Sequence, residues 1–423
     1  MNLLVTNTRN AQAYAIIRSL RPRARRIVAT VSGATALAAY ASHAALARGV
    51  DRRYRVPDPT EDWRRGRIGP DNTPAEERYV QAVLAICRRE AIDVAFPSWD
   101  PYVYVFAKNR ARFQEAGVLV PVPPFELLVS LMDKYACTRL AAAHGLACPR
   151  TLLPTRAEEV MDLAAALGVP LVAKPRFSSG GRGIVLARTP ADLAPLAAGG
   201  PPPEGWPCLQ EYVPGATRWS AMVLIDARGQ VKELFCERWL RALAGSSSAE
   251  ETIPPPPEAE RFARFLADLG YRGAAFGQFK VDPRDGVSKL LEVNVRMSAG
   301  VWTEMRAGID VPWLVLQIAR GEEIPVQSSP PGRVELWVAE DLLGLAAGLL
   351  ADLRGRGLEA PVEGTRVHRA LARLRAFAAT YRAPGRVVDF YTSDVWREPL
   401  VALAYWAQLL GATWRNRRNL ALG

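Results

Sequence analysis

Cysteine and histidine are scarce in this sequence, and their scarcity excludes several classes of site. The 423 residues include only five cysteines and three histidines, which are scattered without a CxxC pair or a metal-ligand spacing. This pattern predicts neither a disulfide framework nor a zinc site, and it is typical of a protein kept in a reducing cytoplasm. It also gives no indication of a Cys–His or Ser–His nucleophile.

Long apolar runs and the features of a secretory leader are missing as well. The first ten residues, MNLLVTNTRN, lack a basic start and a long apolar stretch, so they predict a buried strand and no export. The most apolar late stretch, residues 399–414, contains Gln408 and is shorter than the roughly 20 residues that span a membrane. Tryptophans in this tail leave contact with a membrane surface as an alternative, although we favour packing on the body of the protein. They are Trp396, Trp406 and Trp414.

Lysine is rare although the chain is basic. The net charge is +11, yet only six of the 54 basic residues are lysines. The densest arginine cluster, at residues 18–26, has no interleaved aromatic residues, so we interpret it as a solvated face and predict no nucleic-acid binding. Where arginine is used almost everywhere, a lysine indicates a position that needs a compact point charge. Three of the six lysines fall in the motifs described below.

The remaining composition is that of an ordinary globular protein, with 49% hydrophobic and 23% charged residues, and the length predicts two to four compact units. Residues 1–125 alternate short apolar runs with helical patterns, which predicts a parallel, doubly wound α/β sheet. No GxGxxG follows the first strand, so this unit is expected to be Rossmann-like in shape only. Its predicted strands are residues 3–6, 26–30, 54–57, 93–97 and 118–121.

Three further units are predicted after the first. The second unit, residues 126–214, reads as a linker helix followed by a small α+β lobe with a glycine-rich loop. The helical pattern itself runs from residue 124 to residue 143. Residues 215–330 contain antiparallel-looking strands at 220–226 and 231–237, a polar loop at 245–252, and a hairpin formed by residues 274–282 and 289–296. Residues 331–423 form an extension that is mostly helical.

The hairpin carries the sharpest chemical pattern. Gln278 on its first strand faces Glu292, Asn294 and Arg296, which period-two alternation places on one side of the second strand. Magnesium takes a few oxygen ligands from side chains and leaves its other positions to water and phosphate, so this set can hold it. The arginine could neutralise a transferred phosphoryl group. The alternative is an ordinary polar face of a hairpin.

Two weaker patterns precede the hairpin. Lys174 ends an apolar strand and is followed by Pro175 and the sequence FSSGGRG, in which glycines allow backbone amides to approach a phosphate. The spacing is not that of a Walker P-loop, and a plain turn is the alternative. The strand LQEYVPG, at residues 209–215, could read an adenine edge through its backbone or be structure alone.

The order of these features resembles the ATP-grasp superfamily. A helix lysine, Lys134, precedes the strand lysine with its glycine loop, the apolar strand and the metal hairpin. The nearest resemblance is to the carbamoyl-phosphate synthetase-like and carboxylate–amine ligase branches, over residues 1–325, and GQFKVDPRDG with LLEVNVR is its most specific part. The resemblance implies a Rossmann-like pre-ATP-grasp domain, a B lobe with a lid loop, and a C lobe with an antiparallel sheet.

The resemblance also implies roles for individual residues. Lys134 and Lys174 look like the lysines that hold the ATP phosphates, and Arg296 like the residue that stabilises the transition state. Lys280 could contact an acyl phosphate or a substrate carboxylate, with pairing to Glu292 as the alternative. The residues that look like the lid loop are Ser178, Ser179, Gly180, Gly181 and Gly183. Those that look like the adenine hinge are Gln210, Glu211, Tyr212 and Val213. Those that look like the ligands of two magnesium ions, with manganese as an alternative metal, are Gln278, Glu292 and Asn294.

Two positions depart from the family pattern. Val295 stands where proline is common, and we expect no effect because its side chain should point away from the site. Arg218 stands where relatives usually have a glutamate for the ribose, a task that Glu211 could take over. The serine-rich loop at 245–248 could meet a carboxylate substrate or be a solvent loop.

The resemblance implies an ATP- and magnesium-dependent ligase that joins a small-molecule carboxylate to an amine or thiol through an acyl phosphate, releasing ADP and phosphate. A cytoplasmic location is expected, and an oligomer is compatible with the sequence. The alternative function is an altered ATP-binding protein with a sensing or scaffolding role.

Overall fold

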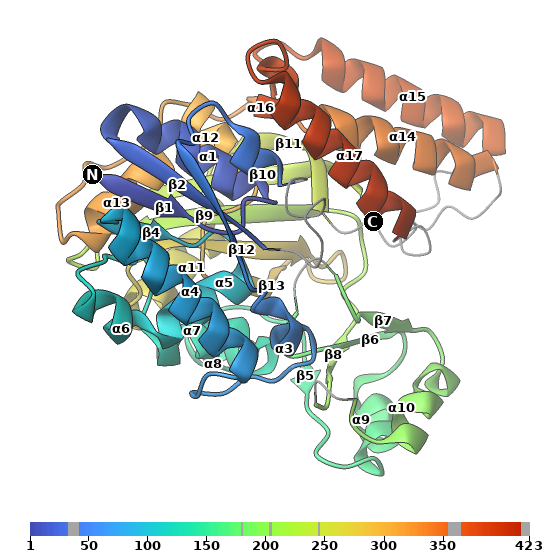
Figure 1. Cartoon of the computed structure of the whole chain (residues 1–423). Coiled ribbons are helices and arrows are strands. Elements are labelled where there is room, and N and C mark those ends of the chain that lie inside the picture. The colour runs from blue at the N-terminus through green and yellow to red at the C-terminus, as the bar shows by residue number, and fades with distance from the viewer. Residues whose placement is uncertain (33–41, 179–180, 203–204, 244–245, 354–364, 416–423) are drawn as a thin grey trace.

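In the computed structural model, the described part of the chain is organised by three β-sheets (Figure 1). The structure describes all residues except 33–41, 179–180, 203–204, 244–245, 354–364 and 416–423. The described part has the mixed α/β architecture expected from the sequence.

The first sheet is parallel and has the strand order β3-β2-β1-β4. Its core strand β1 is fully buried, as expected for a sheet covered on both faces. The predicted fifth strand at 118–121 is wrong: only one bridge, Val94 to Leu119, forms there. The elements of this part are β1 (Asn2–Val5), α1 (Ala11–Leu20), β2 (Arg26–Ser32), η2 (His43–Leu46), β3 (Arg52–Val56), α3 (Thr60–Arg64), α4 (Pro74–Glu90), β4 (Val94–Phe96), α5 (Asp100–Lys108) and α6 (Arg110–Glu115).

The predicted linker helix is broken into two helices, α7 (Phe125–Met132) and α8 (Lys134–Ala143). Asp133 has an extended backbone and its carboxylate accepts hydrogen bonds from the backbone N–H groups of Tyr135 and Ala136. This side-chain cap starts a new helix at Lys134. Lys134 therefore lies at a helix N-terminus and not in the middle of a helix.

A small second sheet has the strand order β5-β8-β6-β7 and carries its helices on one face, at the lower right of Figure 1. Its core is a separate small cluster that includes Val160, Leu171 and Leu209. The elements are β5 (Thr151–Leu152), α9 (Glu159–Leu167), β6 (Leu171–Lys174), β7 (Val185–Ala187), η3 (Pro190–Leu193), α10 (Ala194–Gly199) and β8 (Cys208–Glu211).

The third and largest sheet has seven strands in the order β13-β12-β9-β10-β11-β14-β15. The predicted polar loop at 245–252 is wrong, because residues 246–253 form strand β11. The elements are β9 (Arg218–Ile225), β10 (Val231–Leu243), β11 (Ser246–Ile253), α11 (Pro257–Asp268), β12 (Gly273–Val281), β13 (Ser288–Asn294), α12 (Trp302–Arg306), α13 (Val311–Ala319), β14 (Val334–Leu336) and β15 (Val387–Val388).

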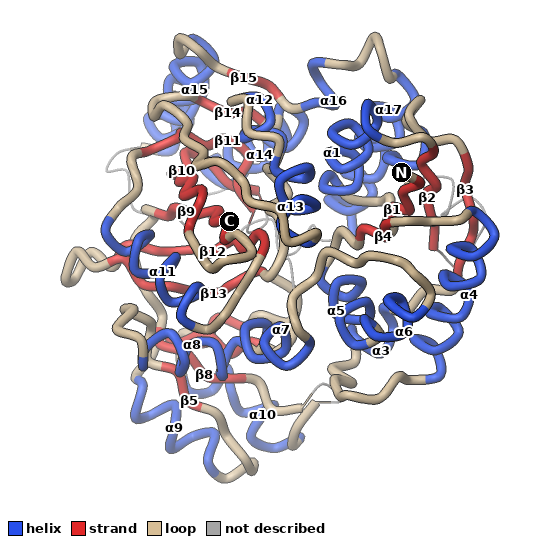
Figure 2. The backbone as a smooth tube through the Cα atoms, turned by 90° about the vertical axis from the view of Figure 1, so that its left-hand side faces the viewer, coloured by secondary structure: helices blue, strands red, loops and turns tan. Residues whose placement is uncertain are grey.

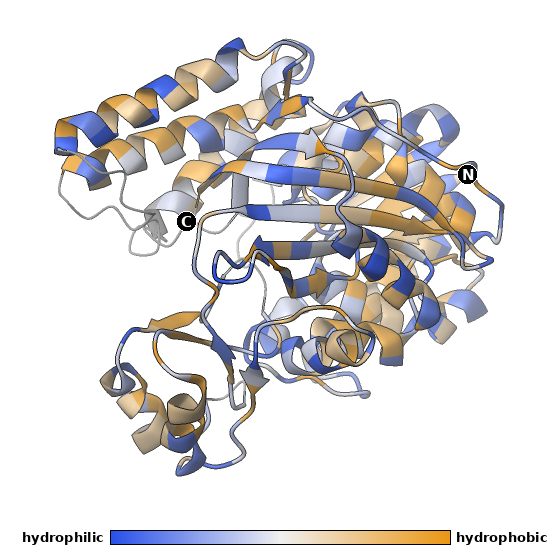
Figure 3. Cartoon of the chain, turned by 180° about the vertical axis from the view of Figure 1, so that it is seen from behind, coloured by the Kyte–Doolittle hydropathy of each residue, from blue (hydrophilic) through white to orange (hydrophobic). Residues whose placement is uncertain are grey.

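The two larger sheets lie side by side, with α1 and α13 in contact between them (Figure 2). One hydrophobic cluster joins Leu3 and Ile16 of the first unit to Leu224 and Leu316 of the other. The central strands of the large sheet are apolar where they meet the first unit and more polar toward the small lobe (Figure 3). The polar ends of these strands therefore face the small lobe, where the candidate site lies.

The described part of residues 331–423 is mostly helical but also adds β14 and β15 to the large sheet. Their helices are α14 (Val338–Leu353), α15 (Arg366–Arg382), α16 (Phe390–Ser393) and α17 (Pro399–Arg415). Helix α17 packs on the first unit, where the Gln408 amide donates to the Arg9 carbonyl at 2.7 Å, while Trp396 is 91% exposed. Among the described residues, none of the helices is both long enough and apolar enough to cross a bilayer.

Candidate active site

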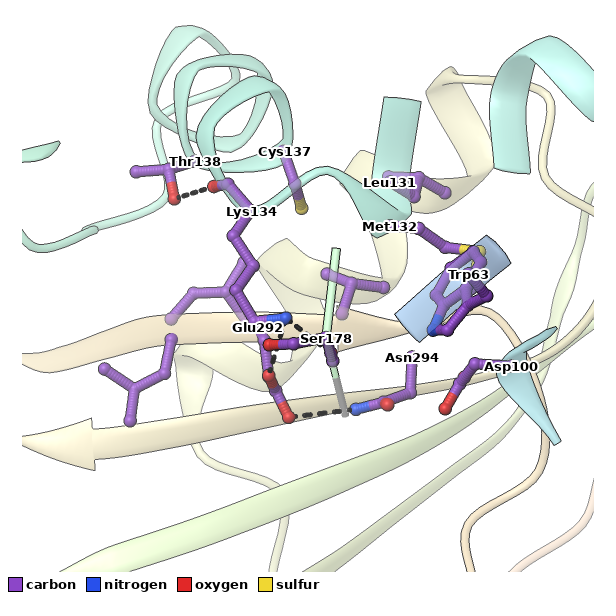
Figure 4. Close-up of a pocket in the computed structure, with 13 residues that line it drawn as sticks. Trp63, Asp100, Leu131, Met132, Lys134, Cys137, Thr138, Ser178, Glu292 and Asn294 are labelled. Atoms are coloured by element: carbon purple, nitrogen blue, oxygen red, sulfur yellow. Dashed lines mark hydrogen bonds and ion pairs between the residues drawn. The ribbon is translucent and has the colours of Figure 1, made fainter. Parts of the chain in front are cut away.

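Lys134 and two of the three predicted metal ligands, Glu292 and Asn294, line one pocket between α7, α8, the glycine-rich loop and strand β13 (Figure 4). These residues belong to separate motifs in the sequence. The fold brings together Lys134, which precedes the small lobe in the chain, and the hairpin residues, which follow it. The pocket is lined by Trp63, Asp100, Leu131, Met132, Lys134, Cys137, Thr138, Ser178, Leu290, Leu291, Glu292, Val293 and Asn294.

The hairpin presents its polar residues on one face. Gln278 pairs directly with Glu292 in the antiparallel register, so their side chains lie on the same side of the sheet. Asn294 follows on that side, and its amide nitrogen lies 3.4 Å from Glu292 Oε1. Glu292 pairs with Gln278 and Leu290 pairs with Phe279, so Leu291 is an extra residue that forms a β-bulge in β13. Such a bulge bends the strand and changes the direction of the side chains beside it. The three predicted metal ligands are all partly exposed and thus accessible to an ion.

The opposite face of the hairpin is a tightly packed support. Phe279 stacks on Trp219 with ring centroids 4.0 Å apart, and Phe262 of α11 meets Phe279 edge-on. Gly277 leaves the room that the Phe262 ring occupies, since a β-carbon there would lie 2.7 Å from Phe262 Cζ. The apolar packing on this face fixes the strand that carries Gln278.

Lys134 reaches from the start of α8 toward the hairpin. Its Nζ lies 3.7 Å from Glu292 Oε2 and donates to the Ser178 carbonyl at 2.7 Å. The start of α8 is held by the ion pair between Arg176 and Asp133, whose hydrogen bonds include 3.0 and 3.1 Å contacts. Lys134 thus links the metal hairpin to the first residue of the predicted lid loop.

Lys174 stands at the end of β6 and is 6% exposed. Burial lowers the pKa of Lys174, while the nearby carboxylate of Glu292 opposes this effect. Lys134 lowers this pKa further as a like charge. The Lys134 backbone N–H donates to the carbonyl of Arg176, two residues after Lys174, at 3.1 Å, so the two lysines belong to adjoining segments. Two buried cations beside one carboxylate leave positive charge unbalanced, which suits the phosphate groups of a nucleotide.

Arg296 is held by an aspartate that sequence reasoning did not identify. Arg296 Nε donates to Asp100 Oδ1 at 2.9 Å and its Nη2 donates to Asp100 Oδ2 at 3.0 Å, while Nη2 also lies 3.1 Å from Asn294 Oδ1. Asp100 begins α5 just beyond the carboxyl end of strand β4. An acidic residue at that position of a parallel sheet is a signal that could have identified it, because ligands bind at this edge.

The predicted lid loop is only partly described. Ser179 and Gly180 lie outside the described residues, and Ser178 contributes its carbonyl to Lys134 as given above. Gly183 has a φ of +73°, and a β-carbon there would lie 2.7 Å from Pro175 Cγ. Only glycine meets both conditions, which favours a defined turn at the end of the loop. Gly181 is exposed beside it with a φ of +68°.

The predicted adenine hinge lies on β8 and the residues after it, outside the lining of this pocket. The Gln210 amide donates to Thr151 Oγ1 at 2.9 Å, and Val213 is buried. Glu211 forms ion pairs with Arg284 and, at 3.6 Å, with Lys289. The Glu211 carboxylate, which could take over the role of the ribose-binding glutamate that Arg218 replaces, is thus already paired with two cations.

Lys280 and Arg218 lie opposite each other on neighbouring strands. Lys280 is buried and its Nζ lies 5.0 Å from the centre of the Tyr212 ring, so it adjoins the hinge. The Arg218 guanidinium lies 5.7 Å from the centre of the Trp239 ring. Both residues thus stand at the end of the sheet that faces the small lobe.

The donor set fits a magnesium–nucleotide group. One carboxylate and two amide side chains offer hard oxygen atoms in a partly exposed position, and two lysines stand beside them. Magnesium bound to phosphates usually takes only one or two carboxylates from the protein. The site therefore has the residues that such a group requires.

No protein-family model matches the chain. Among curated proteins, pyruvate carboxylase 1 of Caenorhabditis elegans is 26% identical over 271 residues, which cover 58% of this chain and 22% of that protein. The carbamoyl phosphate synthase large chain of Deinococcus deserti is 29% identical over 205 residues, which cover 46% of this chain and 20% of that protein. The chain thus spans about a fifth of the length of each of these relatives.

Solved structures share the fold at low identity. The biotin carboxylase domain of the 2-oxoglutarate carboxylase of Hydrogenobacter thermophilus, solved with MgADP, ADP and bicarbonate, matches with a TM-score of 0.60 and 19% identity, over 76% of this chain and 70% of that one. The biotin carboxylase of Campylobacter jejuni, solved as a β-γ-ATP complex, matches with a TM-score of 0.60 and 18% identity, over 76% and 72%.

Proposed function

We propose, from the premise that the chain belongs to the ATP-grasp superfamily, that it is an ATP- and magnesium-dependent ligase acting on a carboxylate. The ligase would join that carboxylate to an amine or a thiol and release ADP and phosphate. The observation that carries the proposal is the convergence of Lys134, Glu292 and Asn294 in one pocket, with Lys174 close by and Gln278 paired to Glu292.

The proposed reaction has two steps. A carboxylate oxygen of the substrate attacks the γ-phosphorus of ATP, the bond to the β-phosphate oxygen breaks, and an acyl phosphate and ADP form. The amine nitrogen or thiol sulfur then attacks the acyl carbon, phosphate leaves with the electron pair of the broken C–O bond, and the nucleophile gives up a proton. Each step needs charge neutralisation and the exclusion of water more than it needs a protein nucleophile.

The residues of this chain divide the work by their positions. Lys134 and Lys174 would hold the phosphates as point charges, and Gln278, Glu292 and Asn294 would hold magnesium. Magnesium supplies the charge that offsets the transferred phosphoryl group. Arg296 would stabilise the developing charge, and Asp100 would fix the direction of its guanidinium. Two magnesium ions, and manganese in their place, remain part of this proposal.

Bicarbonate belongs among the carboxylates to be tested, because the Hydrogenobacter structure was solved with bicarbonate. Substrate loops vary on a shared scaffold, so the fold does not select among carboxylates. Lys280 would contact the carboxylate or the acyl phosphate, since it lies on the same face as Gln278 and beside Tyr212. A cytoplasmic location and an oligomer of this chain are likewise proposals.

A second candidate function is an ATP-binding protein that senses nucleotide or serves as a scaffold without ligation. The observation that favours it is that two of the charged residues expected to serve the reaction are bound by other side chains. Arg296 is bound by Asp100, and Glu211 is bound by Arg284. Arg218 also replaces the family's acid.

The experiment that separates the two functions measures ADP release from magnesium-ATP. The purified chain is supplied with pooled carboxylates, including bicarbonate, with and without pooled amines and thiols, and Glu292→Gln is the matched control. Release that requires a carboxylate and is lost in the control supports the ligase. Tight ATP binding with no ADP release in any pool supports the second function.

A further inference from the structure

Five glutamates are buried away from the pocket described above, four on strands β10, β11 and β14 of the large sheet and one, Glu304, on helix α12. Their exposed fractions are 4% or less. Glu250 pairs with Glu335 across strands β11 and β14, and Glu237 lies diagonally from Glu250 on the same face. The five are Glu233, Glu237, Glu250, Glu304 and Glu335.

Three of these carboxylates can reach one point. One oxygen from each of Glu237, Glu250 and Glu335 lies within 4.8 Å of the others. Oxygen ligands bound to one cation at 2.3 to 2.6 Å are separated by about 5 Å at most. A single ion can therefore contact all three without a large movement of the chain.

The cluster has no positive partner among the residues that the structure describes. None of the ion pairs found there involves any of the five glutamates, whereas the next residue, Glu251, pairs with Arg238 on the other side of the sheet. Burial raises the pKa of Glu250 to about 7 and those of Glu304 and Glu335 to about 8. Uncompensated charge at this position is costly, and a bound cation would offset the cost.

Unpartnered polar groups point to a missing ligand. The hydroxyl of Ser298, a residue that is 4% exposed, has no hydrogen-bond partner among the described residues. A β-carbon on Gly300 would lie 3.6 Å from Ser298 Oγ and 3.8 Å from Glu250 Oε2, so these two groups border the same small space. Both carboxylate oxygens of Glu233, which is 2% exposed, also have no partner in the described structure.

Few hydrogen-bond donors reach the cluster: Ser247 acts on Glu250, and Thr303 stands between two of the other glutamates. Thr303 Oγ1 lies 3.1 Å from Glu237 Oε1 and 2.9 Å from Glu304 Oε2. A hydroxyl has one proton and can donate to only one of these oxygens. Neither oxygen of Glu335 has a hydrogen-bond partner within the described part of the chain. The oxygens therefore greatly outnumber their donors.

We propose that Glu237, Glu250 and Glu335 bind a divalent cation that prefers oxygen ligands, with Glu304 and Ser298 completing the site. This site is distinct from the one at the hairpin. Glu237, Ser220, Gln278 and Glu292 form one row across four neighbouring strands. Three strand spacings separate the ends of that row, a distance of about 14 Å.

The site would have a structural effect on the proposed active site. Ser298 and Glu304 come two and eight residues after Arg296 in the chain, whereas Glu237, Glu250 and Glu335 belong to the sheet. A bound cation would tie the segment after Arg296 to strands β10, β11 and β14. The inference does not depend on the proposed ligase activity, because it requires no nucleotide.

The test measures manganese binding without nucleotide. The full chain is stripped with a chelator and titrated with Mn²⁺, and free Mn²⁺ is followed by electron paramagnetic resonance. The test variant is the double substitution Glu250→Gln with Glu335→Gln, which preserves side-chain volume. The matched controls are Glu251→Gln, on the other side of β11, and Glu292→Gln, at the hairpin.

The proposal predicts a bound Mn²⁺ that remains in Glu251→Gln and in Glu292→Gln, whether or not the hairpin binds a further ion, and whose affinity falls at least tenfold in the double variant. Absence of binding in the wild type, unchanged affinity in the double variant, or loss in Glu292→Gln would overturn it. Thermal unfolding of the stripped proteins shows whether the double variant folds. The single variants Ser298→Ala and Glu335→Gln, made separately, serve as the second test. Methylammonium tests the alternative that the cluster binds an organic cation. A melting temperature that rises with methylammonium but not with Mn²⁺ would also overturn the metal assignment.

Discussion

Asp100 and Arg296 lie 196 residues apart in the chain and hold each other through two parallel hydrogen bonds of 2.9 and 3.0 Å. Their side chains are 5% and 16% exposed, so the pair is shielded from water. The pair joins the edge of the first sheet to the end of the hairpin formed by β12 and β13. It makes the orientation of Arg296 depend on the packing between two units of the fold.

The first prediction concerns this pair. If Asp100 fixes Arg296 for phosphoryl transfer, Asp100→Asn should lower kcat about tenfold or more, and Arg296→Ala should lower it further. The KM for ATP should change less than twofold in Asp100→Asn, because this aspartate binds Arg296 and not the lysines proposed to hold the phosphates. Steady-state ADP release measures both quantities. A higher kcat in Asp100→Asn would show instead that Asp100 restrains the arginine.

The second prediction concerns Lys174. Lys174→Met retains an apolar side chain about as long as the carbon chain of lysine and removes the buried charge, so the fold should be retained while affinity for magnesium-ATP falls about tenfold or more. Calorimetric titration gives this affinity. The control is Lys232→Met, since Lys232 pairs with Asp226 at 3.3 Å on another part of the sheet and should leave ATP affinity unchanged. Equal losses in the two variants would argue against a specific role for Lys174.

The third prediction concerns the support behind the hairpin. Gly277→Ala places a methyl group 2.7 Å from the buried Phe262 ring and should destabilise the protein by about 1 to 3 kcal/mol. Gly344→Ala is the opposite case, because it lies in helix α14 and its nearest contact would be 3.6 Å. That variant should be neutral or slightly more stable. Urea unfolding of both variants measures the change in the free energy of unfolding, which should be a loss in Gly277→Ala and zero or a gain in Gly344→Ala.

The fourth prediction concerns acid stability. His43 is fully buried beside Gln408 and Tyr391, and burial lowers its pKa to about 4. The unfolded chain takes up a proton near pH 6.5 and the folded chain does not, so this group costs stability as pH falls from 6.5 to 4.

Between pH 7 and pH 5 the His43 contribution amounts to about 2 kcal/mol. His43→Gln should lose less stability than the wild type over this range in urea unfolding experiments. Parallel losses in the two proteins would show that His43 does not titrate as described.

The fold class and the hairpin could be predicted because their signals are local. Alternating apolar runs and helical patterns determine the parallel sheet, and period-two spacing places Glu292 beside Asn294 whatever the rest of the chain does. The positions of Lys134 and Lys174 beside this hairpin followed only from the family resemblance. Nothing in their own segments indicates that α8 and β6 meet β13.

Other features could not be read from the sequence for physical reasons. Strand β11 has the sequence SSSAEETI, which lacks the apolar alternation of a half-buried strand, so it reads as a loop. Its Glu250 meets Glu335 only through pairing with a strand more than 80 residues later. The break at Asp133 was missed because a capping aspartate inside an apolar helical pattern does not by itself reveal a helix end.

The most direct test of the central claim is the trapping of an acyl phosphate. The full chain is incubated with magnesium-ATP, pooled carboxylates that include bicarbonate, and hydroxylamine in place of the natural nucleophile, and hydroxamates are identified by mass spectrometry. The proposed ligase predicts a hydroxamate from one carboxylate, formed in equal amount with ADP and absent in Glu292→Gln. ADP formation without any hydroxamate, or a hydroxamate that persists in Glu292→Gln, would contradict the proposed chemistry at this site.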